Sequence, residues 1–268
     1  MEPGPQILLR DAGISTWNAV FLLAVVAGYP ILAIACRLRL GEPGPRGLAL
    51  RYLGTAYGSA LAAQLFAYLV DRHTSAFPAA SVDPLRYYLD PFYGPKVLYG
   101  AVLALPLTGL TLWLPARGVT LRAALDCWTP PLLAVLGIAR IGCWLEGCCY
   151  GVPASYLGMS FPMGSPAYQR HLAQGLIPPD AASLPVVPTQ AIEALTLLVL
   201  CAMALHVLRA GRRGVFVPTI AAYSLLRFAL EFARDDPERN GFGPLAVSQW
   251  IALAVVSTFV LARRPVRA

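Results

Sequence analysis

Charged residues are scarce in this chain, and lysine is nearly absent. Only 13% of the 268 residues are charged, whereas a soluble domain carries about a quarter. Lys96 is the one lysine, so the net charge of +7 rests on arginine. The arginines sit mainly in short segments between apolar runs, a pattern typical of membrane proteins and not of nucleic-acid-binding surfaces. The composition therefore argues against a soluble domain and against a nucleic-acid partner.

The N-terminal segment lacks the features of a cleavable signal peptide. Residues 1–13 contain Glu2, Asp11 and two prolines, where a signal peptide has a basic region followed by a short apolar stretch. The first apolar run, over residues 17–36, is about long enough to cross a bilayer. We expect this run to act as an uncleaved signal anchor.

Seven apolar runs have about the length that crosses the hydrocarbon core of a membrane. Several contain glycine or proline, which helix bundles tolerate because neighbouring helices satisfy the freed backbone groups. The chain has no internal repeat of the transporter kind and no low-complexity tract. We therefore predict an all-α fold, a polytopic membrane bundle with about seven transmembrane helices in one domain over residues 1–268. The predicted spans are 17–36, 52–70, 97–114, 123–143, 190–208, 214–233 and 246–262.

The arginines also predict the orientation. They concentrate in alternate connections and in the C-terminal tail, while the other connections hold most of the acids. By the positive-inside rule, the N-terminus lies outside and the C-terminus in the cytoplasm. Two outside connections, at about 71–96 and 151–189, are long, and such loops often serve as lids or binding loops. The arginines that set this prediction are Arg37, Arg39, Arg46, Arg51, Arg117, Arg122, Arg209, Arg212, Arg213, Arg263, Arg264 and Arg267.

The outer end of the fourth span combines charge with small residues. Arg140 is followed six residues later by Glu146, and Gly142, Gly147 and Gly151 interrupt the helix. Small residues allow close approach of a backbone or ligand, and a guanidinium binds phosphate through two parallel hydrogen bonds. Two interpretations stay open: a phospholipid phosphate site at Arg140, or an Arg140–Glu146 pair that only closes the helix end.

The sixth span carries a polar stripe. Tyr223, Arg227, Glu231 and Arg234 follow at spacings of four, four and three residues, which places them on one helix face. Because ionisable groups inside membranes rarely face lipid, this face predicts a polar cavity. A purely structural Arg–Glu bridge is the alternative.

The fifth span opens with a short polar segment, residues 188–193. Pro188 and Thr189 are good helix-start residues, so one interpretation is simply a capped helix start. Gln190 and Glu193 would lie on the first turn, in the outer half of the bundle near the two sites above.

These three segments together resemble the bacterial prolipoprotein diacylglyceryl transferase family. The fourth-span run is similar to the family pattern Gly-Arg-x-Gly-Asn-Phe-x-Asn-x-Glu-x-x-Gly at Arg140, Gly142 and Gly151. Residues 188–194 resemble its Pro-Ser-Gln-x-x-Glu-Ala, and residues 223–234 resemble its Tyr-x-x-x-Arg-Phe-x-x-Glu-Phe-x-Arg. Gln249, at the start of the last span, also fits. The motifs lie in the second half of the chain.

The chain also departs from the family pattern. Cys143 and Glu146 stand where the family has asparagines, and Cys148 stands where it has a glutamate. Tyr99 lies where the family has a histidine in the third span, and Val187 where another histidine precedes Pro-Ser-Gln. The resemblance therefore indicates a divergent member.

The resemblance implies a transfer reaction at the outer leaflet of the bacterial cytoplasmic (inner) membrane. The diacylglyceryl group of phosphatidylglycerol would pass to the lipobox cysteine thiol of a preprolipoprotein, in lipoprotein maturation. Two alternatives stay open: a related enzyme with another acceptor, and a non-catalytic lipid-binding paralogue. No cofactor and no metal is expected. The expected catalytic residues are Arg140, Glu146, Arg227, Glu231 and Tyr223, and the expected substrate-binding residues are Gly142, Gly151, Tyr99, Gln190, Glu193 and Arg234.

Three of the six cysteines cluster at residues 143, 148 and 149. They are candidates for a metal site, a disulfide or a nucleophile. A zinc site usually has four ligands, and the three histidines are scattered. Because the cluster is expected on the oxidising side, the sequence favours packing or a disulfide.

Overall fold

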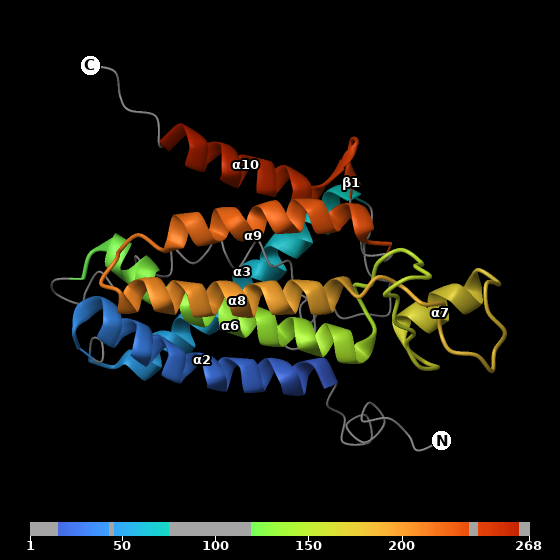
Figure 1. Ribbon diagram of the computed structural model, residues 1–268, viewed down its shortest axis with the longest axis horizontal. Helices are drawn as coiled ribbons and strands as arrows, with labels where there is room; N and C mark the ends of the chain where they lie inside the picture. The colour runs from blue at the N-terminus through green and yellow to red at the C-terminus, as the bar shows by residue number, and fades with distance from the viewer. Residues whose placement is uncertain (1–15, 43–45, 75–118, 236–240, 263–268) are drawn as a thin grey trace.

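The computed structural model describes residues 16–42, 46–74, 119–235 and 241–262, and Figure 1 traces them. Side chains are described for these residues except at 63, 64, 66–74, 241, 242 and 259–262. The predicted third span (97–114), Tyr99 and nearly all of the loop at 71–96 lie outside the described residues. The described elements are α2 (Thr16–Leu40), α3 (Leu48–Thr74), α6 (Leu121–Glu146), α7 (Pro166–Ala173), α8 (Thr189–Arg209), α9 (Phe216–Leu230), the 3-10 turn η1 (Glu231–Ala233), β1 (Gly241–Phe242), β2 (Leu245–Ala246) and α10 (Val247–Ala262).

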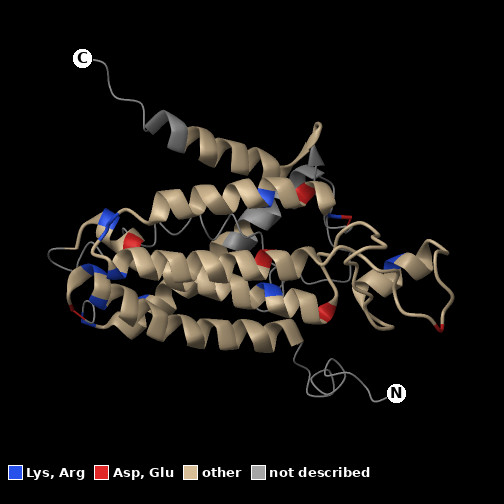
Figure 2. Cartoon of the chain, in the orientation of Figure 1, with Lys and Arg blue, Asp and Glu red and all other residues tan. Residues whose placement is uncertain are grey.

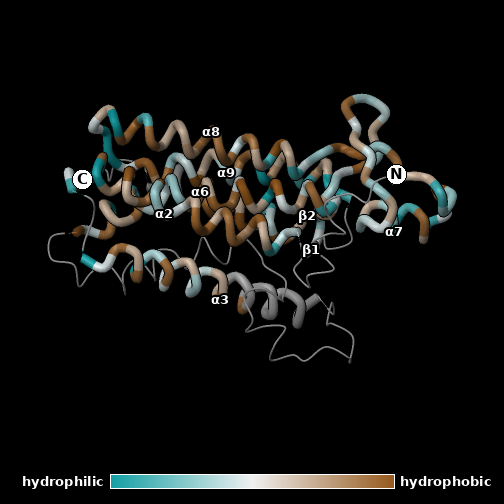
Figure 3. The backbone as a smooth tube through the Cα atoms, turned by 90° about the horizontal axis from the view of Figure 1, so that it is seen from below, coloured by the Kyte–Doolittle hydropathy of each residue, from teal (hydrophilic) through white to brown (hydrophobic). Residues whose placement is uncertain are grey.

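The described elements are helices apart from one short hairpin and three isolated β-bridges, which agrees with the predicted helical class. Four helices are long and apolar enough to cross a membrane: Thr16–Leu40, Leu121–Glu146, Thr189–Arg209 and Phe216–Ala233. A shorter apolar helix covers Val247–Thr258. The hairpin pairs Gly241 with Ala246 and Phe242 with Leu245 in antiparallel register. The chain therefore has the helices of a membrane protein (Figure 3).

The bundle is built around α6. This helix packs between α2 and α8, while α9 packs on α8 and carries α10 on its other side (Figure 1). Gly137 lets α6 approach α8 closely, because a Cβ there would lie 3.1 Å from Leu198 and 3.3 Å from the carbonyl of Ala194. This close contact brings the last two turns of α6 against the first turns of α8.

Two apolar clusters fill the bundle. One joins α2, α3 and α6, and in it Tyr52 stacks on Trp128 with ring centroids 5.6 Å apart. The other joins α2, α6, α8 and α9 around Leu133, Leu197 and Tyr223. The second cluster thus reaches the start of the polar stripe on α9, since Tyr223 belongs to that cluster and to the stripe.

A buried carboxylate locks the end of the bundle that lies away from α7. Asp126, on α6, is 1% exposed. Its oxygens accept hydrogen bonds from Arg39 Nε (2.8 Å) and from the backbone N–H groups of Gly214 (3.0 Å) and Val215 (2.8 Å). Asp126 thereby holds the two residues that precede α9 and ties them to the last turn of α2.

We expect Asp126→Ala to destabilise the protein strongly. The substitution leaves Arg39 and two backbone donors unpaired, and removing one partner of a buried pair costs about 3–5 kcal/mol. The thermal midpoint of detergent-purified Asp126→Ala should fall well below that of Arg37→Ala, a control at an exposed arginine of α2, two residues before Arg39. Equal midpoints for the two variants would contradict this role of Asp126.

Candidate active site

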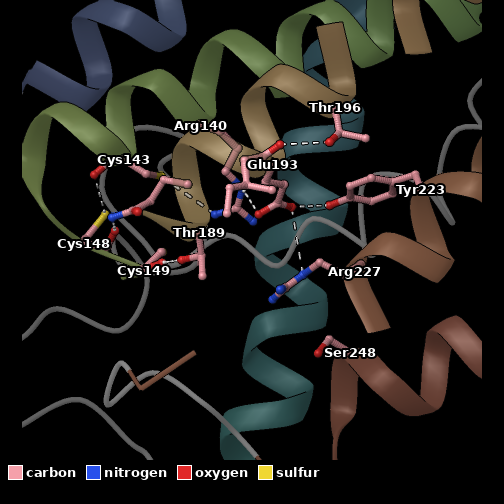
Figure 4. Close-up of polar contacts among 12 residues, drawn as sticks. Arg140, Cys143, Cys148, Cys149, Thr189, Glu193, Thr196, Tyr223, Arg227 and Ser248 are labelled. Carbon is pink, nitrogen blue, oxygen red and sulfur yellow. Dashed lines mark hydrogen bonds and ion pairs between the residues drawn. The ribbon is translucent and has the colours of Figure 1, made fainter. Parts of the chain in front are cut away.

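Glu193 lies at the centre of a buried polar cluster where α6, α8 and α9 meet. Its carboxylate is within 3.0 Å of Arg140 Nε and 4.0 Å of Arg227 Nε, and it accepts a hydrogen bond from the Tyr223 hydroxyl at 2.5 Å (Figure 4). Only 4% of the Glu193 side chain is exposed. One carboxylate on the first turn of α8 therefore links two arginines that come from different helices.

Arg227 reaches a second carboxylate on its own helix. Its Nη2 is 2.8 Å from Glu231 Oε2, which also accepts a hydrogen bond from Ser248 Oγ at 2.9 Å. The Nη1 of Arg227 is buried and has no hydrogen-bond partner among the described residues. Because buried N–H groups in folded proteins are nearly always paired, this donor calls for a partner beyond the described residues, such as an anionic or carbonyl ligand.

The helical spacing of the stripe explains how α9 supplies these groups. Tyr223, Arg227 and Glu231 lie one turn apart, and all are buried, at 1%, 7% and 3% exposure. The helix then tightens into the turn Glu231–Ala233 and becomes extended at Arg234, which is 9% exposed. There the backbone pairs with Gly151, so the end of α9 is joined to the segment that follows α6.

Glu146 does not pair with Arg140. Its Oε1 accepts a hydrogen bond from the backbone N–H of Trp17 at 2.9 Å, which places it at the first turn of α2. A carboxylate is favourable at a helix N-terminus because it satisfies unpaired N–H groups and opposes the helix dipole. The interpretation in which Arg140 and Glu146 close one helix end therefore does not describe this structure.

The two glycines of the fourth-span motif allow close packing of the protein on itself. A Cβ on Gly142 would lie 3.2–3.4 Å from Trp17 and Val20 of α2. A Cβ on Gly151 would lie 2.5 Å from the carbonyl of Ala233 and 2.8 Å from Val187. Gly151 therefore requires glycine for this backbone contact, and Gly142 packs tightly against α2.

The first turn of α8 holds Cys148 and Cys149, which follow the end of α6, in place. Gln190 Nε2 donates to the carbonyl of Cys148 at 2.5 Å, and Thr189 Oγ1 donates to the carbonyl of Cys149 at 2.6 Å. Gln190 is 1% exposed, and its Oε1 has no hydrogen-bond partner among the described residues. Gln249 bonds elsewhere, to the backbone at Ala246 and Phe228, and so ties α10 to α9.

Residues 147–188 form a small module at the end of the bundle (Figure 1). Its core contains Tyr150, Phe161, Ala167 and Val186. Inside it, His171 Nδ1 accepts a hydrogen bond from the N–H of Leu184 at 3.2 Å, and burial lowers the pKa of His171 below its usual value of 6.5, with the Asp235 carboxylate opposing that shift. The neutral imidazole is thus the form that fits the fold.

This histidine should make the protein less stable in acid. Because its folded pKa lies below the unfolded value, the unfolded state binds the proton more readily, so stability is lost as the pH falls below about 6.5. We expect the decline in thermal midpoint between about pH 7 and pH 5 to flatten in His171→Asn, whose amide can accept the Leu184 hydrogen bond. His206→Asn, at an exposed histidine, should keep the wild-type decline; a decline that is unchanged in His171→Asn would contradict the role of His171.

The sequence did not point to Ser248 or Asp126. The signal for Asp126 was present, since an acid within an apolar span usually has a specific partner. Ser248 carried none, because a serine near a helix start is common. Tyr99 lies outside the described residues.

Comparison with known proteins gives a consistent result. Residues 11–263 match the family model described as prolipoprotein diacylglyceryl transferase. The chain is 31% identical over 180 residues to phosphatidylglycerol–prolipoprotein diacylglyceryl transferase 2 of Clostridium perfringens, covering 65% of this chain and 63% of the relative. The like-named protein of Clostridium tetani is 27% identical over 163 residues (60% and 59%), and that of Dehalococcoides mccartyi is 31% identical over 174 residues (62% and 61%). The matches span about three fifths of the length of these relatives.

Proposed function

Because the chain belongs to the prolipoprotein diacylglyceryl transferase family, we propose that it transfers the diacylglyceryl group of phosphatidylglycerol to the lipobox cysteine of a preprolipoprotein. The observation that carries this proposal is the buried cluster in which Glu193 joins Arg140 and Arg227, while Arg227 Nη1 has no hydrogen-bond partner among the described residues. A phosphate that enters this cluster meets two guanidinium groups away from bulk water. Such preorganised positive groups are suited to stabilising a phosphate leaving group.

The reaction replaces a carbon–oxygen bond with a carbon–sulfur bond. The acceptor thiolate, which is the reactive form of cysteine, attacks the glycerol carbon that carries the phosphate ester. The bond from that carbon to the ester oxygen breaks, and its electron pair leaves with glycerol phosphate. The thiol proton passes to water. Charge develops on the phosphate oxygens, which is where Arg140 and Arg227 act in this proposal.

The carboxylates in the cluster are positioning groups in this mechanism. Glu193 lies between two arginines and Glu231 holds Arg227 from the next turn, so each fixes a guanidinium for a bidentate contact with phosphate. The Tyr223 hydroxyl donates to Glu193 and so helps to hold that carboxylate between the two arginines. We assign Gln190 and Arg234 to the rim of the site.

Four predicted residues have other roles or remain predictions. We assign Glu146 to the start of α2, since its carboxylate binds the backbone there. We assign Gly142 and Gly151 to close packing that shapes the site. Tyr99, in the predicted third span, stays a prediction as a group that binds the lipid headgroup or the acceptor.

We place the site in the outer half of a seven-span, single-domain bundle over residues 1–268, in the bacterial inner membrane. The distribution of charge supports this orientation: basic residues gather at the end of the bundle opposite α7 (Figure 2), whereas Glu193 lies on the first turn of α8, which binds the 147–188 module. By the positive-inside rule the basic end faces the cytoplasm. The N-terminus and the 147–188 module then lie outside, together with the loop at 71–96.

A transfer assay tests this function. Purified full-length protein is mixed with phosphatidylglycerol vesicles and a lipobox peptide, and the mass of the peptide is measured by mass spectrometry. We expect the peptide to gain one diacylglyceryl group, and we expect no gain with a serine-for-cysteine peptide or with phosphatidylethanolamine vesicles. The absence of a mass gain with phosphatidylglycerol would contradict the proposal. If the protein still bound phosphatidylglycerol in that case, the result would favour a non-catalytic paralogue.

A further inference from the structure

Three thiols converge at the end of α6, beside the cluster described above. Cys143 lies in the last turn of the helix, and Cys148 and Cys149 follow its C-cap, Gly147. The three sulfur atoms all lie within 4.8 Å of one another, and none is in a disulfide. This separation suits three ligands of one metal ion.

The loop that carries these thiols is held in an unusual backbone conformation. Gly147 has φ +70° and Cys149 has φ +59°, a left-handed conformation that non-glycine residues adopt rarely. Gln190 donates to the carbonyl of Cys148, and Thr189 donates to the carbonyl of Cys149 (Figure 4). Because such strain persists only where the surroundings fix it, the thiols are preorganised and not brought together by a loose turn.

Access and charge both suit a cation at this position. Cys143 is buried, whereas Cys148 and Cys149 are partly exposed, so an ion can enter from the loop side. The Nη1 of Arg140 lies 3.9 Å from Cys143 Sγ. Three thiolates with one divalent cation carry a net charge of −1, which the adjacent guanidinium balances.

The other two interpretations of the cysteines account for less. A covalent lipid carrier would form a thioether on Cys148, and a thioether does not release its carbon to a second thiol under these conditions. A disulfide would join two of the three sulfurs and leave the third unexplained. A metal ion uses all three.

We propose that Cys143, Cys148 and Cys149 bind one thiophilic divalent cation, with zinc as the best fit, and leave its fourth position open for the acceptor thiol. Zinc takes tetrahedral sites, and catalytic zinc has three protein ligands and one exchangeable position. Among the described residues, no histidine or carboxylate joins this group to complete it. The role of the fourth position rests on the transfer reaction proposed above.

The proposed cation answers a question that the arginine cluster leaves open, namely what ionises the acceptor. A thiol that binds such a cation releases its proton to water. The resulting thiolate attacks the glycerol carbon, and the ester oxygen leaves with its electron pair as part of glycerol phosphate. Arg140 lies between the proposed cation site and the phosphate site, since it contacts both Cys143 and Glu193.

Metal binding can be measured without any lipid. The full-length protein, stripped with a chelator and kept reduced, is titrated with Co²⁺ as a coloured substitute for Zn²⁺. We expect one Co²⁺ per chain with thiolate-to-metal charge-transfer absorption, displaced by Zn²⁺. This signal should be lost in Cys148→Ser and in Cys149→Ser, and kept in Cys201→Ser, a buried cysteine of α8 outside the cluster. Absence of stoichiometric uptake, or equal uptake by Cys148→Ser, would overturn the site. A thiol titration of the unreduced protein that finds two fewer free thiols than the chain contains would indicate a disulfide and would also overturn it.

The open position is tested by adding peptides to the Co²⁺-loaded protein. A lipobox peptide with cysteine should change the ligand-field spectrum, whereas the serine peptide should not. The same spectrum with both peptides would overturn the proposal that the acceptor thiol binds the fourth position of the cation. Because neither measurement involves phosphatidylglycerol or turnover, a failed transfer assay with a positive peptide response would count against the proposed function and not against this site.

Discussion

Replacing Arg227 with alanine is expected to lower the rate of lipid transfer by about 10³-fold, the upper part of the range for losing one preorganised donor to a developing anion. Arg227 is 7% exposed, is held by Glu231 and Glu193, and has one guanidinium nitrogen free of protein partners among the described residues. It is therefore the group best placed to receive the phosphate. Arg227→Lys should recover only part of the rate, because an ammonium keeps the charge and loses the two-pronged geometry.

The measurement is the initial rate of peptide lipidation with saturating phosphatidylglycerol vesicles. Arg209→Ala, at an exposed arginine at the end of α8, is the matched control and should keep the wild-type rate. Thermal midpoints of all variants identify loss of fold. An Arg227→Ala protein that is folded and works at nearly the wild-type rate would contradict the phosphate role.

Replacing Glu193 with alanine is expected to reduce both stability and transfer. Its carboxylate contacts Arg140, Arg227 and the Tyr223 hydroxyl, so its loss leaves two buried guanidinium groups without their shared counter-charge. Removal of one partner of such a buried network costs about 3–5 kcal/mol. The arginines should also lose their relative position, so we expect a transfer rate lower by about 10²-fold or more.

Glu193→Gln separates these two effects. The amide keeps the shape and can still accept from Tyr223, so the thermal midpoint should fall less than in Glu193→Ala, while the transfer rate stays low. Glu42→Ala, at an exposed acid, is the control for both readouts. If Glu193→Gln transfers lipid at the wild-type rate, Glu193 does not position the arginines through its charge.

The lengths of the apolar runs predicted the helices, and helical periodicity predicted the polar stripe, which follows from 3.6 residues per turn. Tyr223, Arg227 and Glu231 needed no tertiary information to be placed on one face. The predicted spans at 17–36, 123–143 and 190–208 fall within α2, α6 and α8. Their bounds differ by a few residues because caps such as Thr120 and Gly147, and not apolar length, end the helices.

Partners far apart in sequence could not be predicted in the same way. Glu146 was the nearest acid to Arg140 along the chain, yet Glu193 is its partner, because Gly137 brings α8 against α6. The spacing of Cys143, Cys148 and Cys149 indicated proximity but not convergence. That convergence depends on two left-handed residues and on hydrogen bonds from the start of α8.

The claim that the buried arginines hold the phosphate of the lipid donor can be tested most directly by lipid binding. The affinity of the full-length protein is measured for phosphatidylglycerol and for diacylglycerol, which has the same acyl chains and no phosphate. We predict that the wild-type protein prefers phosphatidylglycerol and that Arg227→Ala loses about 10–100-fold of that preference, the value of one or two charge-assisted hydrogen bonds. An equal preference in the wild-type and Arg227→Ala proteins would contradict the account.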